Sequence, residues 1–289
     1  PYGYSDFFVD ASEYLKCGEK NQIRVIARNA DQPNSRWYSG AGIYRPVWMY
    51  TAPAGHILQN GIRVRTISTE PAVIEAEIRA TCAGALDIGI RAAEETEDFA
   101  AEAHEHTDGA ATVRLTVPDA RLWSVDTPYL YRMQVKFTAD TAGSEEADVR
   151  EITFGIRTVG WDTEKGFSIN GERVILRGAC IHHDNGVLEA CDRLGMLVMD
   201  EFVDVWYIHK TEYDYVNYFN DWWKQDLKDM VRKDFNHPCV VMYSTGNEVS
   251  ETAQPKGIRL TKQMTEYLHH LDETRPVTCG INIFFNFLS

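Results

Sequence analysis

Three features are missing from this chain: a membrane span, a metal-binding cysteine pattern and an excess of basic residues. No run of about 18 consecutive apolar residues occurs, which is the length that a transmembrane helix needs. Lys and Arg number 29 against 43 Asp and Glu, and the net charge of −14 argues against nucleic acid or an anionic membrane as a partner. Such acidity is typical of soluble enzymes. It does not exclude an anionic substrate, because a pocket can differ in charge from the whole protein.

The cysteines are few and scattered, with no C-x-x-C pair and no repeated spacing. This absence excludes the usual zinc and redox motifs, and it indicates reduced, mostly buried thiols. Reduced thiols are typical of a cytoplasmic protein, so the sequence predicts that location. The six positions are Cys17, Cys82, Cys180, Cys191, Cys239 and Cys279.

The 289 residues are 44% hydrophobic, enough for a large core, and this length suggests about two or three domains. Residues 1–53 have a period of two at 22–27 and 47–50, which predicts two strands. The loop between them is rich in Gly, Arg and aromatic residues. A functional loop and a packed turn fit this composition equally well. Arg36 is the candidate substrate-binding residue of this loop.

Residues 54–158 consist of short alternating segments separated by turn residues. Residues 74–78 and 129–137 are clear examples, and about 100 residues of this kind predict an immunoglobulin-like β-sandwich. His104 and His106 lie in a charged stretch, where solvated side chains are more common than metal ligands. We expect this domain to be a spacer.

Beyond residue 158 apolar strands alternate with amphipathic helices. This alternation predicts a parallel sheet, and the polar residues that follow the strands favour a (β/α)8 barrel over a doubly wound sheet. The predicted strands are 173–179, 196–199, 240–245 and 277–279, and the predicted helices are 223–235 and 260–271. The 120 residues from Asn170 to Ser289 are fewer than the roughly 250 of a complete barrel, so we expect the sequence to be part of a larger protein.

The apolar run 240–245 ends at Gly246 and is followed by Asn247 and Glu248. In a β/α barrel the chemistry takes place at the C-terminal ends of the strands. A carboxyl group held there beside apolar walls can keep its proton near neutral pH and act as a general acid. Glu248 is therefore the predicted catalytic acid. A structural salt bridge to an Arg is the alternative.

Cleavage of a glycoside requires two carboxyl groups, and other strand ends supply further polar candidates. Asp200 and Glu201 follow a neighbouring strand and are candidates for the second carboxyl group or for substrate binding. His182 is a candidate for hydrogen bonds to sugar hydroxyls. Trp206 offers a ring that could stack on a sugar, although core packing explains it equally well.

Several motifs, in this order along nearly the whole chain, resemble glycoside hydrolase family 2. They are residues 37–45 (WYSGAGIYR), 122–131 (LWSVDTPYLY), 177–184 (RGACIHHD), 194–201 (LGMLVMDE), 236–238 (NHP) and 246–248 (GNE). The resemblance implies the C-terminal part of a jelly-roll sugar-binding domain at 1–53, an immunoglobulin-like sandwich at 54–158 and an incomplete TIM-barrel catalytic domain at 159–289.

The resemblance also implies a retaining exo-β-glycosidase that acts on a carbohydrate or glycoconjugate without a cofactor, and large members of the family often form homo-oligomers. Glu248 would be the acid/base, Asn247 would bind the sugar 2-hydroxyl, and His182 would line the subsite of the cleaved sugar. Some relatives use the position of Glu201 as a magnesium ligand. A second ligand is not recognisable here, so no metal is predicted.

Two departures from the family pattern concern missing parts. The nucleophilic Glu of the family is expected beyond Ser289. The family pattern has a helix and a barrel strand between the positions of Leu188 and Glu189, so we expect that a segment is omitted there.

Substrate choice rests on two segments. Residues 272–279 are more similar to β-glucuronidases, whereas residues 37–45 occur in many β-galactosidases, and we favour a β-glucuronide. The alternatives are a β-galactosidase, an inverting enzyme that pairs Glu248 with Asp200 or Glu201, and a non-catalytic carbohydrate-binding protein.

Overall fold

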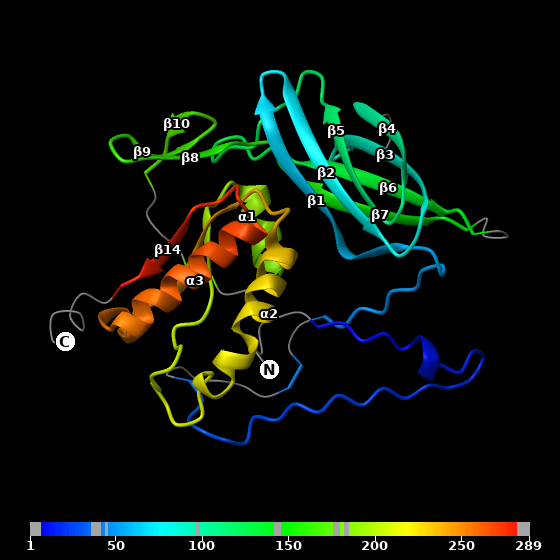
Figure 1. Cartoon of the computed structure of the whole chain (residues 1–289). Coiled ribbons are helices and arrows are strands. Elements are labelled where there is room, and N and C mark those ends of the chain that lie inside the picture. Colours follow the sequence, from blue (N-terminus) through cyan, green and yellow to red (C-terminus); the bar gives the residue numbers. More distant parts are fainter. Residues whose placement is uncertain are drawn as a thin grey trace.

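The computed structural model describes residues 7–35, 42–43, 46–95, 99–141, 146–175, 180–181 and 185–281. A β-sandwich lies next to a parallel sheet with helices packed against it, and a long N-terminal segment runs along one side (Figure 1). No helix within the described ranges has the length and apolar character needed to cross a membrane.

The sandwich consists of two antiparallel sheets with the strand orders β1-β2-β5 and β4-β3-β6-β7. Alternate residues of both sheets point into one shared core, as the period of two predicts. The strands are β1 (Ile57–Thr69), β2 (Ala72–Ala80), β3 (Gly84–Ala92), β4 (Ala101–Thr107), β5 (Ala110–Thr116), β6 (Tyr131–Ala139) and β7 (Asp148–Phe154). The predicted sandwich is therefore confirmed in its architecture, while its boundaries at 54 and 158 stay a prediction.

The described part of residues 7–53 contains one short 3-10 helix, η1 (Ser12–Tyr14), and no strand. The strands predicted at 22–27 and 47–50 are absent, and Ile23, Ile26 and Trp48 are exposed. A period of two makes a strand only where another strand can pair with it and cover its apolar face. No described segment does so here, and the jelly-roll assignment of residues 1–53 stays a prediction.

The chain after the sandwich begins with a small antiparallel sheet in the order β10-β9-β8, followed by a parallel sheet in the order β11-β12-β13-β14. These strands are β8 (Val159–Asp162), β9 (Gly166–Ile169), β10 (Glu172–Arg173), β11 (Cys180–Ile181), β12 (Val198–Glu201), β13 (Val240–Asn247) and β14 (Val277–Gly280). The parallel sheet is the predicted one, and its four strands lie side by side in the order of the sequence.

The strand predicted at 173–179 is wrong in its described part. Strand β10 ends at Arg173 and pairs antiparallel with β9, and Ile175 is exposed. Residues 176–179 lie outside the described residues, and the parallel strand β11 comprises Cys180–Ile181. An apolar run shows that a segment can be buried, but it does not show where the strand changes partner.

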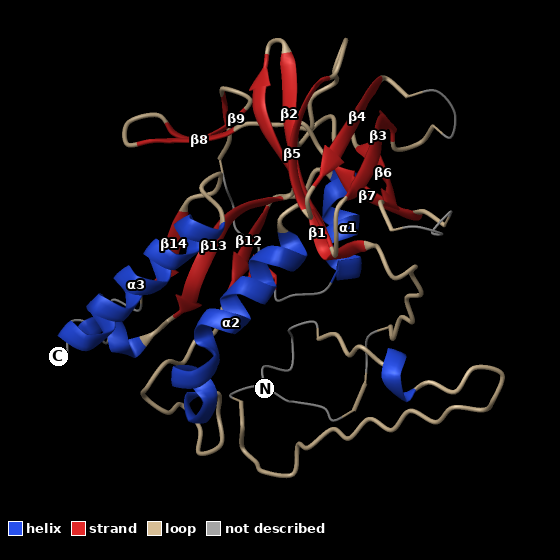
Figure 2. Ribbon diagram, turned by 45° about the vertical axis from the view of Figure 1, so that its right-hand side comes forward, coloured by secondary structure: helices blue, strands red, loops and turns tan. Residues whose placement is uncertain are grey.

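The described α-helices are α1 (Asn185–Leu194), α2 (Val216–Asp234) and α3 (Pro255–Leu271), with a short 3-10 helix, η2 (Ser250–Ala253), between β13 and α3. Two of the three, α2 and α3, follow the predicted apolar spacing, and α1 was not predicted. Helix α2 buries Phe219, Trp223 and Leu227 on one face, and α3 buries Met264 and Leu268. Both helices pack beside the parallel sheet (Figure 2). Helix α1 runs without a break across the Leu188–Glu189 junction.

The turn between α2 and β13 binds the sandwich. The side-chain amide of Asn236 donates to the carbonyl of Ile62 at 2.8 Å and accepts from the N–H of Val64 at 2.9 Å. Strand β1 has irregular pairing with β2 next to these residues. Asn236 therefore completes the hydrogen bonding of β1 and fixes the two domains relative to each other.

Two arginines donate hydrogen bonds to backbone carbonyls of the same turn from opposite sides. Arg157, just after the sandwich, donates to the carbonyls of Pro238 at 2.6 Å and Val240 at 2.7 Å. Arg275, just before β14, donates to the carbonyls of Phe235 at 2.8 Å and Val240 at 2.7 Å, and to Asp272 at 2.6 Å. Burial, followed by the nearby charge of Arg275, lowers the pKa of Arg157 to about 9.

We predict that Asn236→Ala destabilises the protein by about 1–2 kcal/mol, because it leaves one N–H and one carbonyl of β1 without their partner. Urea unfolding measures the change. Gln225→Ala on the exposed face of α2 is the matched control and should alter the free energy of unfolding by about 0.5 kcal/mol or less. Equal stability of the two variants would show that the amide does not join the domains.

Candidate functional site

Strand β13 carries the predicted acid at its C-terminal end. Its residues are buried up to Gly246, whereas Asn247 and Glu248 are exposed. Gly246 has φ 154°, and a Cβ there would lie 2.4 Å from the carbonyl oxygen of Val203, so only glycine fits. Glu248 has φ 51°, a left-handed conformation that is uncommon for this residue type. The chain thus turns sharply to present Asn247 and Glu248 at the edge of the sheet.

A buried carboxylate three residues later organises the facing loop. One oxygen of Glu251, Oε1, accepts hydrogen bonds from the backbone N–H groups of Trp206, Tyr207 and Ile208 at 2.8, 2.9 and 2.9 Å. Glu251 is fully buried, and three N–H donors around one oxygen form a cradle for negative charge. The loop after β12 is therefore tied to the segment that follows Glu248.

Helix α3 approaches this segment closely. A Cβ at Gly257 would lie 1.8 Å from the carbonyl oxygen of Glu251, so the contact requires glycine at that position. Pro255 occupies the first turn of the helix, where its missing N–H costs no hydrogen bond. The start of α3 consequently holds Glu251 in place.

A lysine stands beside the candidate site on the same loop. The ammonium group of Lys210 lies 3.0 Å from the carboxylate of Asp204 and 3.4 Å from the backbone carbonyl of Asn247. Asp214 in turn accepts from the N–H groups of Lys210 at 2.7 Å and Thr211 at 2.9 Å. These contacts join the loop after β12 to the last residue of β13, next to Glu248.

The predicted second carboxyl groups are both buried. Asp200 is 1% exposed and Glu201 3% exposed. Burial, and then the carboxylate of Asp234, raise the pKa of Asp200 well above its ordinary value, while the ammonium of Lys233 opposes this. Asp200 therefore lies against the C-terminal end of α2, and neither residue is exposed beside Glu248. Their substrate-binding role stays a prediction.

Trp206 is completely buried, and its indole N–H donates to the carbonyl of Thr245 at 3.3 Å. This position fits core packing, the alternative considered for it, better than a stacking face for sugar. His182 and Arg36 lie outside the described residues, so the structure places neither of them.

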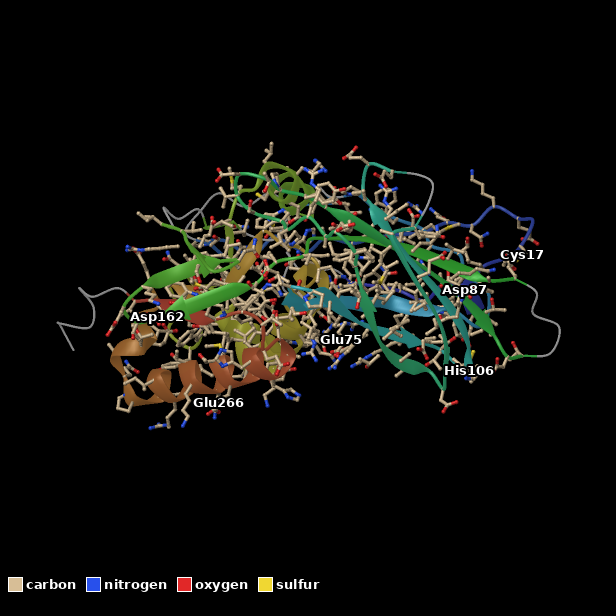
Figure 3. The ribbon with its side chains drawn as sticks, turned by 90° about the horizontal axis from the view of Figure 1, so that it is seen from above. Cys17, Glu75, Asp87, His106, Asp162 and Glu266 are labelled. Carbon is tan, nitrogen blue, oxygen red and sulfur yellow. The ribbon has the colours of Figure 1, made fainter. Side chains whose placement is uncertain are left out.

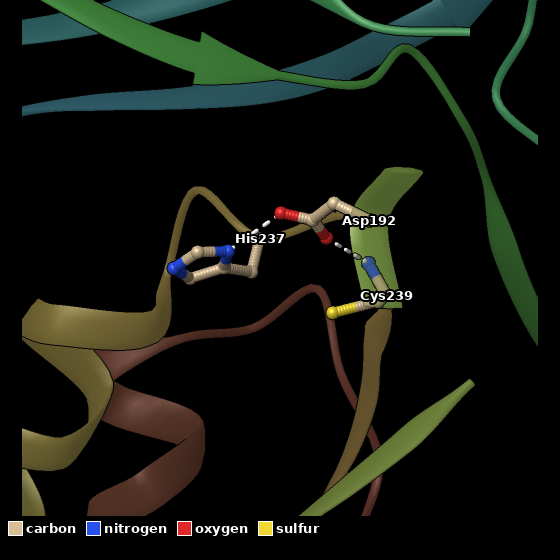
Figure 4. Close-up of side chains that lie close together, drawn as sticks. All are labelled: Asp192, His237 and Cys239. Carbon is tan, nitrogen blue, oxygen red and sulfur yellow. Dashed lines mark hydrogen bonds and ion pairs between the residues drawn. The ribbon is translucent and has the colours of Figure 1, made fainter. Parts of the chain in front are cut away.

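Three potential metal ligands meet at the opposite end of the sheet (Figure 4). Suitable atoms of Asp192, His237 and Cys239 lie within 4.8 Å of one another. The carboxylate of Asp192 already binds Nδ1 of His237 at 2.6 Å and the backbone N–H of Cys239 at 3.0 Å. Burial raises the pKa of the Cys239 thiol, which disfavours the thiolate that a metal needs. This cluster is best explained as a hydrogen-bonded support for the start of β13.

The sequence reasoning missed Glu251, Lys210 and Asp214. Asp214 has a recognisable signal, because an Asp just before an amphipathic helix is typical of a helix start, and it bonds the N–H of Val216 at 3.1 Å. Glu251 has no such signal, since its three partners are backbone groups more than 40 residues away.

We predict that Glu251→Ala destabilises the protein by about 3 kcal/mol or more, because three N–H groups lose a charged acceptor. Glu266→Ala is the control, since Glu266 is exposed on α3 at the margin of the molecule (Figure 3). Hydrogen exchange measured at residues 206–208 should accelerate only in the Glu251 variant. Unchanged exchange there would contradict the cradle.

The buried Asp200 predicts a pH dependence of stability. An acid whose pKa is raised by folding keeps a proton that the unfolded chain releases. Its contribution to the free energy of unfolding is complete below the pKa of the unfolded chain, about 4. That contribution is lost as pH rises through the pKa of the folded protein. Asp234, Lys233, Arg275 and Tyr243 surround it. In Asp200→Asn the unfolding free energy, measured across neutral pH, should fall less with rising pH than in the wild type.

Asp221→Asn is the control, because it removes one carboxylate from an exposed position of α2. Its unfolding free energy should change with pH as that of the wild type does. Parallel slopes for all three proteins would show that Asp200 does not retain its proton on folding.

Comparison with known proteins identifies the family. A family model described as the TIM barrel domain of glycosyl hydrolases family 2 matches residues 177–286, and another described as glycosyl hydrolases family 2 matches residues 61–157. The chain is 34% identical to a β-galactosidase of Bacteroides ovatus over 98% of this chain and 42% of that protein. It is 28% identical to the β-glucuronidase of Felis catus over 86% and 43% of the two chains.

A solved structure of a glycosyl hydrolase family 2 member from Bacteroides cellulosilyticus has a TM-score of 0.85 and 29% identity, covering 97% of this chain and 44% of that one. The chain thus spans less than half the length of these relatives. The alignment with the Bacteroides ovatus protein extends over 363 residues, more than the 289 here, so that protein carries residues without a counterpart in this chain. The two family models cover both the sandwich and the parallel sheet, and the chain belongs to glycoside hydrolase family 2.

Proposed function

We propose that the protein is a retaining exo-β-glycosidase in which Glu248 is the acid/base. The observation that carries the proposal is the exposed Asn247-Glu248 pair at the C-terminal end of β13 in a chain of this family. The left-handed conformation of Glu248 is further support, since uncommon backbone conformations are concentrated at functional sites.

In this reaction Glu248 protonates the glycosidic oxygen as the bond to the leaving group breaks. A second carboxylate, about 5 Å from that of Glu248 in a retaining enzyme, attacks the anomeric carbon, and Glu248 then deprotonates the water that releases the sugar. Asn247 holds the 2-hydroxyl, and His182 lines the same subsite. Glu251 acts indirectly, because its cradle holds the loop that lies next to Asn247.

The first candidate substrate is a terminal β-glucuronide, which the similarity of residues 272–279 to β-glucuronidases favours. The second candidate is a β-galactoside, favoured by the 34% identity with a β-galactosidase. Arg275 lies in residues 272–279, and its buried guanidinium group donates hydrogen bonds to backbone carbonyls. The similarity of that segment therefore reflects packing as well as substrate, and both sugars must be tested.

Two alternative functions remain, a carbohydrate-binding protein and an inverting glycosidase. A carbohydrate-binding protein without a nucleophile would bind sugars and not hydrolyse them. An inverting enzyme would pair Glu248 with Asp200 or Glu201, and the burial of both residues argues against it. Assembly as a homo-oligomer and a cytoplasmic location stay predictions.

We predict that Glu248→Gln lowers kcat/KM of the full-length protein by about 10²–10⁴-fold on the preferred one of two aryl β-glycosides, the glucuronide and the galactoside. Azide should restore turnover of a substrate with a good leaving group, because it replaces the water that Glu248 would activate. Glu266→Gln is the charge-matched control and should retain wild-type activity.

A Glu248 variant with full activity would exclude this residue as the acid/base. Binding of sugars without turnover by the wild type would favour the carbohydrate-binding protein, and release of the inverted anomer, followed by NMR, would favour the inverting enzyme.

A further inference from the structure

A cleft opens between the sandwich and the C-terminal ends of α2 and α3. Both helices run toward the sandwich (Figure 2), and the cleft between them and strands β1 and β2 has a volume of 470 Å³. That volume is within the range of small-molecule sites. Its basic lining residues are Arg63, Arg65, Arg79, Lys228, His269 and His270.

Four Arg and Lys side chains line this cleft against three carboxylates, those of Glu77, Asp272 and Glu273. Arg65 pairs with Glu75 and Glu273. Within the described ranges no carboxylate lies at ion-pair distance from Arg63, Arg79 or Lys228. Such an excess is unexpected in a protein with a net charge of −14.

Arg63 lies deepest among these cations. Its guanidinium group lies 5.1 Å from the ring centre of Phe235 and 3.4 Å from the carbonyl oxygen of Leu271. Burial lowers the pKa of Arg63, the carboxylate of Glu77 opposes this, and the positive charge of Arg79 adds to the lowering. A bound anion would offset both the lost hydration and the repulsion.

A purely structural role explains only part of this arrangement. Arg63 can be retained for its contacts with Phe235 and the end of α3, where a cation is favourable. Arg79 and Lys228 are exposed and come from the sandwich and from α2, so neither contributes to the packing of the other. Their convergence on one cleft is what a ligand of opposite charge would explain.

We propose that this cleft binds an oxyanion, a sulfate or phosphate group that is either free or carried by a sugar. Phe235 and Tyr267 also line the cleft and provide aromatic surface for a sugar ring. The cleft lies at the start of β13 and Glu248 at its end, about 23 Å away at roughly 3.3 Å per residue. The cleft is therefore a second binding site, independent of the proposed hydrolysis.

The test is the shift in melting temperature of the full-length protein on addition of inorganic phosphate, inorganic sulfate, galactose 6-sulfate or galactose at constant ionic strength. Arg79→Gln combined with Lys228→Gln should weaken oxyanion binding about tenfold or more, because both substitutions remove exposed charges without disturbing the core. Lys224→Gln combined with Arg193→Gln removes two exposed charges outside the cleft and should bind as the wild type does.

The control variant is essential, because sulfate and phosphate stabilise most proteins without binding to a site. A larger shift with galactose 6-sulfate than with inorganic sulfate would assign the oxyanion to a sugar, and equal shifts would assign it to the free ion. Equal shifts in the cleft variant and the control variant, or no shift with any oxyanion, would overturn the proposal.

Discussion

The architecture depends on a set of backbone carbonyls at residues 235–240, from the end of α2 to the first residue of β13. Arg157 and Arg275 bind them from the sandwich side and from the β14 side, and both donate to the carbonyl of Val240. Buried carbonyls without donors would cost several kcal/mol in sum, and the lowered pKa of Arg157 shows that placing this charge in the interior is itself costly. The arrangement fixes where β13 begins, and hence where its other end presents Glu248.

The two ends of β13 are held by different chemistry. At the start, cations satisfy carbonyls, whereas at the end the carboxylate of Glu251 satisfies backbone N–H groups. The strand between them is buried and pairs with β12 and β14, so these neighbours also set its position. The backbone position of the exposed pair Asn247-Glu248 is therefore determined by buried groups on both sides.

The sequence predicted those elements whose signal is local. The sandwich strands, α2, α3 and β13 follow from periodicity, and Glu248 follows from the polar end of an apolar run. Residues 22–27 show the same alternation but no partner strand, so a local pattern predicted a strand that does not form. Burial of Trp206 and the cradle of Glu251 depend on contacts across about 40 residues of chain, which no local pattern contains.

The bonds of Asn236 and Arg157 also bear on how such proteins can change. Asn236 hydrogen-bonds to backbone groups of the sandwich, and Arg157 hydrogen-bonds to backbone groups of the turn before β13. Neither domain alone therefore provides all the hydrogen-bonding partners of its backbone. Exchanging the sandwich for that of a distant relative would preserve every side chain of the parallel sheet and still remove a donor on which the turn before β13 relies. The sandwich and the sheet are thus expected to have evolved as a single unit, although they look like separate modules.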